Sequence, residues 1–432
     1  MNNTHPTHTG LRFGGKDDAF KALLLCMLFF NYICGILPML ATNGLFEIIF
    51  TTGVLIAYRT QKLNLLGQFK QQFPLAYWLF ISWLVWTFLA FFRVILFENE
   101  LLSQVGMAVI RQLYLVVQIA FIFAVVKLIR LTSLTYQMLF NAMIFGLIFT
   151  LGYLLLSFHF GPEPVSENWF NYMPLLGHIR VISCVGGPVC VITLVYILLK
   201  EHPSPLFKPL MFVWLTVLWS AMFWTGGRTG ISAALVSSLV VLVASAVFHR
   251  QTLIKLPIIL ACLIGAYFIA DAMAVFSWNG LGRTLHTLQS VSSEPASIAS
   301  QSTGRSFMWT VSLHAMLQHP LLGLGPGGYL FIPEKPFGTD PHNFVIQFLV
   351  EWGFVGAGLL LALMLTAVIH GFKQLPAAFR EKDITYISCA GIVLVLSLYG
   401  ITGSTYFHYQ PLLYLLVGYS AFPYRRGFKP TA

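Results

Sequence analysis

Long apolar stretches alternate with short polar ones along the whole chain. A helix needs about 17 to 25 apolar residues to cross the roughly 30 Å hydrocarbon core of a bilayer. Backbone polar groups inside lipid must be satisfied within the segment, so these stretches predict helices and not strands. We expect twelve transmembrane helices, at residues 19–39, 43–58, 75–92, 106–126, 137–158, 181–199, 209–224, 230–248, 256–276, 343–370, 384–402 and 408–423.

The fold class that this pattern predicts is an all-α polytopic membrane protein, with residues 1–432 forming a single integral-membrane domain. The connections are short except for residues 277–342, between the ninth and tenth predicted helices. A loop of this length is usually functional. We expect it to lie on the external side, to contain amphipathic helices and to carry active-site residues.

Composition narrows the class further. The chain is 57% hydrophobic and only 9% charged, whereas a soluble protein has about 25% charged residues. This excludes a soluble globular enzyme, a disordered tail and a nucleic-acid-binding domain. The net charge of +10 then indicates basic cytoplasmic loops, and 18 of the 25 Lys and Arg residues do fall on the cytoplasmic side if both termini lie there.

The other seven basic residues are external or lie within the membrane, and six of them are Arg. The planar guanidinium binds phosphate or carboxylate with two hydrogen bonds, which Lys cannot do. An alternative is that some of them pair with external acids such as Glu98 or Glu167. The seven are Arg93, Arg111, Arg180, Arg228, Arg283, Arg305 and Lys335.

Cysteine and histidine give no sign of a disulfide or a metal. All six cysteines fall inside apolar spans and are expected to be small core residues. The twelve His are scattered without metal-ligand spacing. We therefore expect no metal ion and no other cofactor.

The second half of the long loop carries two distinct patterns. Residues 305–318 read as an amphipathic helix with Ser302 or Thr303 as its N-cap. Arg305 would lie in the first turn, where free N–H groups and the helix dipole suit an anion, although an exposed Arg on an interfacial helix is the alternative. Residues 319–329 form a Gly/Pro-rich turn segment without the Lys of a nucleotide-binding loop.

Two more positions stand at external helix ends. Asp340 is expected to be the N-cap of the tenth helix with Pro341 as its first residue, so that His342 lies at the helix N-terminus. The dipole there favours a neutral ring that can accept a proton. Arg228 lies between glycines in the turn at residues 225–230, where a ligand could approach the backbone closely. The alternatives are a structural His and an Arg that extends to the interface.

These motifs resemble those of bacterial O-antigen ligases. His342-Asn343, nine residues, Gly353, two residues and Gly356 match the signature His-[Asn/Ser/Gln]-x9-Gly-x2-[Gly/Thr/Tyr]. Residues 302–328 are similar to the periplasmic-loop motif of the wider ligase and polymerase superfamily, and residues 227–230 to its Ser-Arg-Gly turn, with Gly in place of Ser. Order, topology and spacing agree over residues 209–356.

The resemblance implies a metal-independent membrane glycosyltransferase of lipopolysaccharide biosynthesis, located in the bacterial inner membrane with a periplasmic active site. The donor would be O-antigen polysaccharide on undecaprenyl diphosphate, and the acceptor a sugar hydroxyl of lipid A–core oligosaccharide. His342 would be the catalytic base, and Arg228 and Arg305 would bind the diphosphate. Arg111, Arg180 and Asn343 are weaker candidates for substrate binding.

Several alternatives stay open at this point. One base without a nearby carboxylate nucleophile favours inversion, but Glu334 and Asp340 leave retention open. An O-antigen polymerase uses the same donor with a second carrier-linked chain as acceptor, and a protein O-oligosaccharyltransferase would use Ser or Thr. A flippase or transporter is the alternative from a different class, but the polar signals collect on one face.

Overall fold

The computed structural model describes residues 15–30, 39–60, 64–97, 102–160, 180–202, 204–275, 305–333, 341–403 and 409–420. All regular structure in these ranges is helical. In chain order the helices are α1 (Lys16–Phe30), α2 (Met39–Ala57), α3 (Leu65–Gln72), α4 (Pro74–Phe97), α5 (Leu102–Leu131), α6 (Tyr136–Phe160), α7 (Arg180–Leu199), α8 (Phe207–Trp224), α9 (Arg228–Phe248), η3 (Arg250–Lys255), α10 (Leu256–Ala272), α13 (Arg305–Gln318), η5 (Gly328–Phe331), α14 (Phe344–Arg380), α15 (Ile384–Thr402) and α16 (Tyr409–Ser420).

The helices confirm the predicted fold class. Among the described residues, nine helices are long and apolar enough to cross a membrane. The first, second and twelfth predicted spans correspond to α1, α2 and α16, whose described parts have 15, 19 and 12 residues. The chain is a polytopic α-helical membrane protein, and the count of twelve spans stays a prediction.

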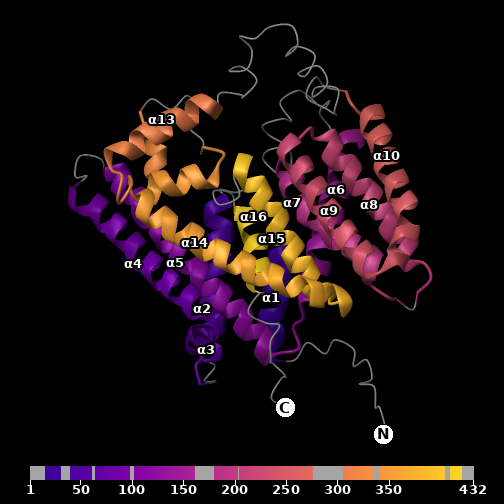
Figure 1. Ribbon diagram of the computed structural model, residues 1–432, viewed down its shortest axis with the longest axis horizontal. Coiled ribbons are helices and arrows are strands. Elements are labelled where there is room, and N and C mark those ends of the chain that lie inside the picture. Colours follow the sequence, from indigo (N-terminus) through magenta and orange to yellow (C-terminus); the bar gives the residue numbers. More distant parts are fainter. Residues whose placement is uncertain are drawn as a thin grey trace.

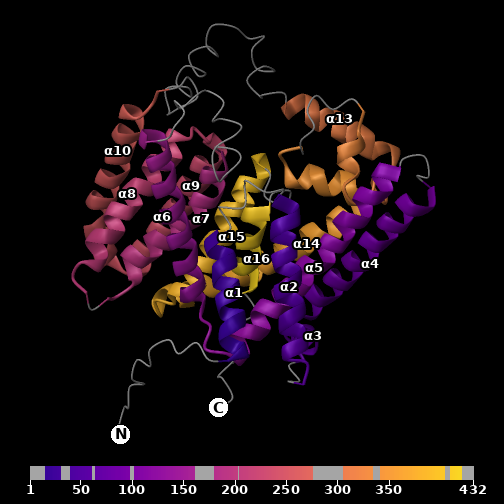
Figure 2. The same ribbon diagram turned by 180° about the vertical axis from the view of Figure 1, so that it is seen from behind.

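The bundle is organised around α7. Every residue of its apolar stretch Ile182–Leu199 is buried, and α7 packs against α8, α9 and α15. Gly187 and Gly230 allow this close packing, since a Cβ atom would meet Val395 Cγ1 at 2.8 Å and the Ser183 carbonyl oxygen at 2.6 Å, respectively. In both views α4, α5 and α14 lie to one side of α15 and α16, and α6, α8 and α10 lie to the other (Figures 1 and 2).

The helix α13 marks one end of the bundle, which we call the α13 end (Figure 1). Met308 and Met316 of α13 pack with Tyr329 of η5 and with Ile346 and Val350 of α14. The helix predicted at residues 305–318 is thus confirmed, and it is folded onto the start of α14. Other predictions concern residues outside the described ranges, namely Cys34, Glu98, Glu167, Arg283, Ser302, Thr303, Glu334, Lys335 and Asp340.

Helix α14 is not the single regular helix that the sequence predicted. Gly353 has φ 66° and ψ −173°, which divides α14 into a first segment, residues 344–352, and a second, residues 354–380. This φ lies in a region that side-chain-bearing residues rarely adopt. The break falls at the first glycine of the signature that begins at His342.

Candidate active site

The Gly/Pro-rich segment after α13 docks into the junction of three helices. Gly323, Gly325 and Gly327 all have positive φ, at 69°, 83° and 73°. A Cβ atom would meet the Gly353 nitrogen of α14 at 2.6 Å from Gly323, the Val94 side chain of α4 from Gly325, and the Arg111 Cγ atom of α5 at 3.1 Å from Gly327. We call residues 320–328 the glycine loop. Glycine is required at these positions because the loop backbone lies close to the neighbouring helices. The segment is not a nucleotide-binding loop.

The glycine loop replaces hydrogen bonds that the break in α14 removes. The backbone N–H groups of Leu324 and Gly325 donate to the carbonyls of Val350 and Glu351, at 2.7 and 3.0 Å. The Phe354 N–H donates in turn to the Pro320 carbonyl, at 2.8 Å. Buried backbone polar groups must be paired, so the loop and the break stabilise each other.

Two side chains of α4 stabilise the glycine loop and the break in α14 by hydrogen bonds. Trp86 Nε1 donates to the carbonyls of Leu321 and Trp352, at 3.3 and 3.2 Å. Arg93 Nη1 donates to the Gly323 carbonyl at 2.7 Å. The external acids proposed as partners for Arg93 lie outside the described residues, and its contact with Gly323 makes it a residue that positions the loop.

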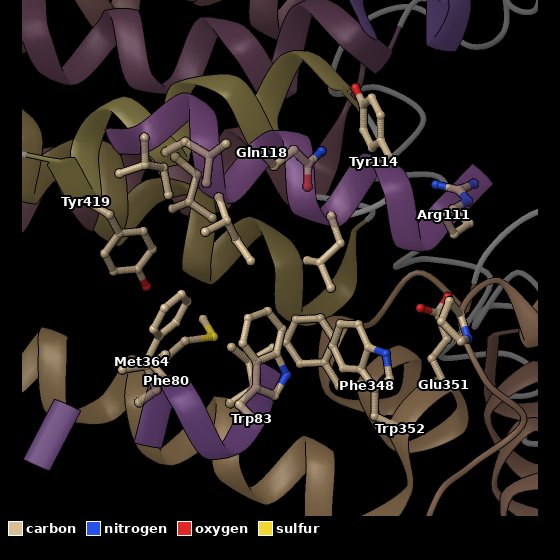
Figure 3. Close-up of a pocket in the computed structure, with 18 of the residues that line it drawn as sticks. Phe80, Trp83, Arg111, Tyr114, Gln118, Phe348, Glu351, Trp352, Met364 and Tyr419 are labelled. Carbon is tan, nitrogen blue, oxygen red and sulfur yellow. The ribbon is translucent and has the colours of Figure 1, made fainter. Parts of the chain in front are cut away.

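A cavity of about 260 Å³ lies beneath the glycine loop, with Pro326 in its wall. Figure 3 shows its polarity: Arg111 and Glu351 lie on opposite walls at one end, Trp83, Phe348 and Trp352 follow, and Phe80, Met364 and Tyr419 lie at the other end. The polar end is the one next to the glycine loop, because Gly327 contacts the Arg111 stem and Gly325 bonds to the Glu351 carbonyl. The cavity therefore suits an amphiphile with its polar group at the α13 end.

Three buried polar atoms in this wall point to a polar ligand or water. Trp83 Nε1, Trp352 Nε1 and Gln112 Oε1 have no hydrogen-bond partner within the part of the chain that the structure describes. The three residues are only 5%, 7% and 3% exposed. A buried polar group without a partner costs about 1–3 kcal/mol, which is recovered when a ligand's oxygen atoms or hydroxyl groups reach it.

Glu47 is a residue of this region that the sequence analysis missed. It lies in α2, is 1% exposed, and acts electrostatically on Tyr114, as does Arg111. Tyr114 itself lines the cavity. An acid inside a predicted apolar span was the available signal, because ionisable residues within a membrane are costly and usually functional.

The structure corrects the predicted start of the tenth helix. Asn343, and not Asp340, is the N-cap of α14: its Oδ1 accepts from the N–H groups of Val345 and Ile346, at 2.9 and 3.1 Å. Pro341 is therefore not the first helical residue, and its carbonyl accepts from Trp309 Nε1 at 2.7 Å. Both Asp and Asn are good caps, so local sequence alone does not choose between them.

His342 directly precedes this N-cap and has φ 51°. Such backbone strain is uncommon outside glycine and is often found at functional sites. The bond from Trp309 to Pro341 and the cap at Asn343 hold His342 from both sides. Its place at the N-terminus of α14 agrees with the sequence prediction, and its role as a base stays a prediction.

The two predicted catalytic arginines lie at the helix ends where they were expected, although Arg228 is the first residue of α9 and not part of the preceding turn. Arg305 begins α13 and is half-buried, and Arg228 begins α9 and is exposed. The glycines beside Arg228 do not serve ligand approach: Gly227 and Gly230 pack against Ser183 of α7. Helix α9 packs mainly on α7 and α15, whereas α13 packs on α14, so the convergence of Arg228 and Arg305 stays a prediction.

The structure distinguishes between the two weaker arginine candidates for substrate binding. Arg111 lines the cavity, together with Glu351 of the segment that begins beside His342. Arg180 is the first residue of α7, and its side chain lies outside the described atoms. The structure thus makes Arg111 a stronger candidate for substrate binding than the sequence indicated.

The chain was compared with known protein families, and one family matches the part that contains the candidate site. Residues 211–361 match the model of the O-antigen ligase family, which includes α8 to α10, α13, the glycine loop and the break in α14. The chain is thus a multi-pass membrane protein that is similar to the O-antigen ligase family over residues 211–361. More particularly, the match confirms the resemblance to the O-antigen ligase superfamily over almost the same residues that the motifs indicated. A search of curated proteins gave no match.

The mutual support of the loop and the break can be tested by Gly353→Ala. We expect a lower unfolding temperature and weaker activity, because a residue with a side chain costs about 1–3 kcal/mol in this region of φ and ψ and its Cβ atom would also contact the Leu321 carbonyl. Gly358→Ala is the matched control, since nothing lies within 4 Å of its Cβ position. Equal unfolding temperatures for the two variants would contradict this account.

Proposed function

We propose that the protein transfers O-antigen polysaccharide from undecaprenyl diphosphate to a sugar hydroxyl of lipid A–core oligosaccharide. The reaction takes place at the periplasmic face of the bacterial inner membrane, with both termini in the cytoplasm. The observation that carries the proposal is the amphiphilic cavity beneath the glycine loop, because its guanidinium end lies next to the loop that the family motif encodes. The family match over residues 211–361 supports it.

In the proposed reaction the diphosphate lies at the Arg111 end of the cavity. The acceptor hydroxyl oxygen attacks the anomeric carbon of the polysaccharide, its proton passes to the neutral ring of His342, and the bond from that carbon to the diphosphate oxygen breaks. Undecaprenyl diphosphate leaves with the extra negative charge. Guanidinium groups stabilise that charge, and one such preorganised donor is worth about 3–4 kcal/mol.

We favour direct displacement by the acceptor over a two-step reaction through a carboxylate nucleophile. Glu351 lines the same cavity as Arg111, and its carboxylate accepts from Gln347 Nε2 at 3.3 Å. In the proposed reaction we assign Glu351 the orientation of neighbouring polar groups and not nucleophilic attack. A single displacement inverts the anomeric configuration. Energy comes from cleavage of the glycosyl diphosphate, so transfer with purified components is expected to need neither ATP nor a divalent cation.

A deletion strain tests the function and separates it from the polymerase alternative. Loss of a ligase leaves bare lipid A–core in the lipopolysaccharide profile, with polymer accumulating on the carrier. Loss of a polymerase leaves core that is capped by one repeat unit. We expect bare core, restored by the intact gene. A profile of single-repeat caps would instead assign the polymerase reaction, and an unchanged profile would refute both.

A further inference from the structure

Three lysines from separate segments lie near the end of α14 that is away from α13, on the side that the proposed topology places in the cytoplasm (Figure 1). Lys208 lies in the first turn of α8, Lys255 is the last residue of η3, and Lys382 follows α14. The charges of Lys208 and Lys382 both act on Lys255, so the three amines lie close together. We call these three residues the lysine site.

Two of these lysines have donors to spare. Lys255 Nζ donates to the carbonyls of Ile197 and Leu198 at the end of α7, both at 2.8 Å. An ammonium group has three donors, so one remains. The described ranges give Lys208 no hydrogen-bond or ion-pair partner, although its charge acts on Glu201. The lysine site can therefore offer hydrogen bonds to a further group.

Lys382 occupies a backbone position that usually belongs to glycine. Its φ is 52°; its N–H donates to the Phe379 carbonyl at 3.1 Å, and the Asp383 N–H donates to the Ala378 carbonyl at 2.9 Å. This is the helix-ending motif in which glycine avoids strain. The ion pair of Lys382 with Glu201, at 2.8 Å, is exposed on both sides and so adds little to stability. The strain thus points to a role of the side chain outside the fold.

Positive charge is in excess around the lysine site. Five basic and three acidic residues lie in the segments that carry it, namely 200–208, 253–258 and 380–383. Of the acids, Glu201 is paired with Lys382, and Asp383 caps α15 by accepting from the Tyr386 N–H at 3.0 Å. The third, Glu381, is exposed. The excess favours an anion as the missing partner.

The surroundings indicate that this anion belongs to a lipid. Leu210 on α8 and Ile254 and Ile258 beside Lys255 are large, apolar and exposed. Only 11% of the apolar stretch of α10 is buried inside the protein, so this helix faces outward along most of its length. The lysine site therefore lies where charged and lipid-facing surfaces meet, which is the depth of phospholipid headgroups. Basic sites of this kind between helices bind anionic headgroups.

We propose that an anionic phospholipid binds here, with its phosphate between Lys208, Lys255 and Lys382 and its acyl chains along α8 and α10. The proposal relies on the proposed function only for the orientation of the protein in the membrane. The bound lipid joins α8, η3 and the turn after α14. Because it binds the folded state, it also stabilises that state.

Lipid binding to the purified full chain in detergent tests the proposal. Native mass spectrometry and thermal unfolding are measured with phosphatidylglycerol or with phosphatidylcholine, which has no net charge. We expect phosphatidylglycerol to be retained preferentially and to raise the unfolding temperature. Lys208→Gln and Lys382→Gly should each weaken its binding about fivefold, the usual effect of one lysine at a membrane surface. Lys70→Gln is the matched control and should change neither, since Lys70 is exposed on α3, which packs against α4.

Lys382→Gly also separates lipid binding from folding. Glycine adopts φ 52° without strain, so without added lipid this variant should unfold at or above the wild-type temperature. A lower unfolding temperature with unchanged lipid binding would mean that Lys382 serves only the fold, and would overturn the proposal.

Three other results would also overturn it. These are equal retention of the two lipids by the wild type, equal losses in Lys70→Gln and Lys208→Gln, and binding of glycerol phosphate as tight as that of phosphatidylglycerol, which would assign a soluble anion. None of these measurements uses transfer activity, so the lipid site and the proposed function can fail separately.

Discussion

Replacing His342 is expected to lower the turnover number by about 10²–10⁴-fold, the usual value of a positioned general base. His342→Gln keeps a similar shape but is a much poorer base, so it should be nearly as inactive as His342→Ala. Donor binding, measured as retention of an undecaprenyl diphosphate probe, should stay close to wild type, because the cavity that we assign to the carrier does not include His342.

The backbone at His342 needs its own control because φ is 51°. His342→Asn tolerates this conformation well and cannot act as a base of comparable strength. We expect His342→Asn to keep the unfolding temperature and lose turnover, whereas His342→Ala loses turnover and some stability. Wild-type turnover in His342→Gln or His342→Asn would show that His342 only positions the loop or the acceptor.

The sequence predicted most of the helices because bilayer thickness and backbone pairing leave few choices for long apolar stretches. It also placed Arg228, Arg305 and His342 at helix starts, since capping signals and glycines mark such ends. These features are local. Each depends on residues within one or two helical turns, which is the range over which a single sequence is informative.

The break at Gly353 could not be predicted in the same way. It persists because the glycine loop, about 30 residues upstream, supplies the hydrogen bonds that α14 loses there. For the same reason the Gly/Pro-rich segment was read only as a turn, although its three positive-φ glycines each meet a different helix. Both features depend on backbone hydrogen bonds between segments that are distant in the sequence, and hydrophobic periodicity does not predict such bonds.

The cavity was the second feature that only the structure shows. Arg111 looked like one of several external arginines, and its importance comes from Gly327 against its stem and from its place at the same end of the cavity as Glu351 (Figure 3). Glu47 was different, because an acid within an apolar span is visible in the sequence. Both acids lie in apolar helices, where an isolated charge is costly and ionisable residues are usually functional.

Arg111→Gln is expected to lower kcat/KM for transfer by about 10²–10³-fold, because the cavity then lacks the charge that stabilises the departing diphosphate. Arg111→Lys should recover only part of this loss, since Lys keeps a charge but not the planar fork that holds two phosphate oxygens. Arg250→Gln is the control: Arg250 is an exposed residue of η3, and its replacement should leave transfer unchanged.

Comparison with Arg228→Ala and Arg305→Ala then shows which of the three guanidinium groups bind the diphosphate. If all three bind the diphosphate, each single replacement should be severe, and a second replacement should add less than the first, because residues that act as a unit are not additive. Retention of the undecaprenyl diphosphate probe should fall most in Arg111→Gln, whose side chain lies within the cavity. Near-normal retention and turnover in Arg111→Gln would mean that the diphosphate is held outside the cavity, by the arginines at the starts of α9 and α13.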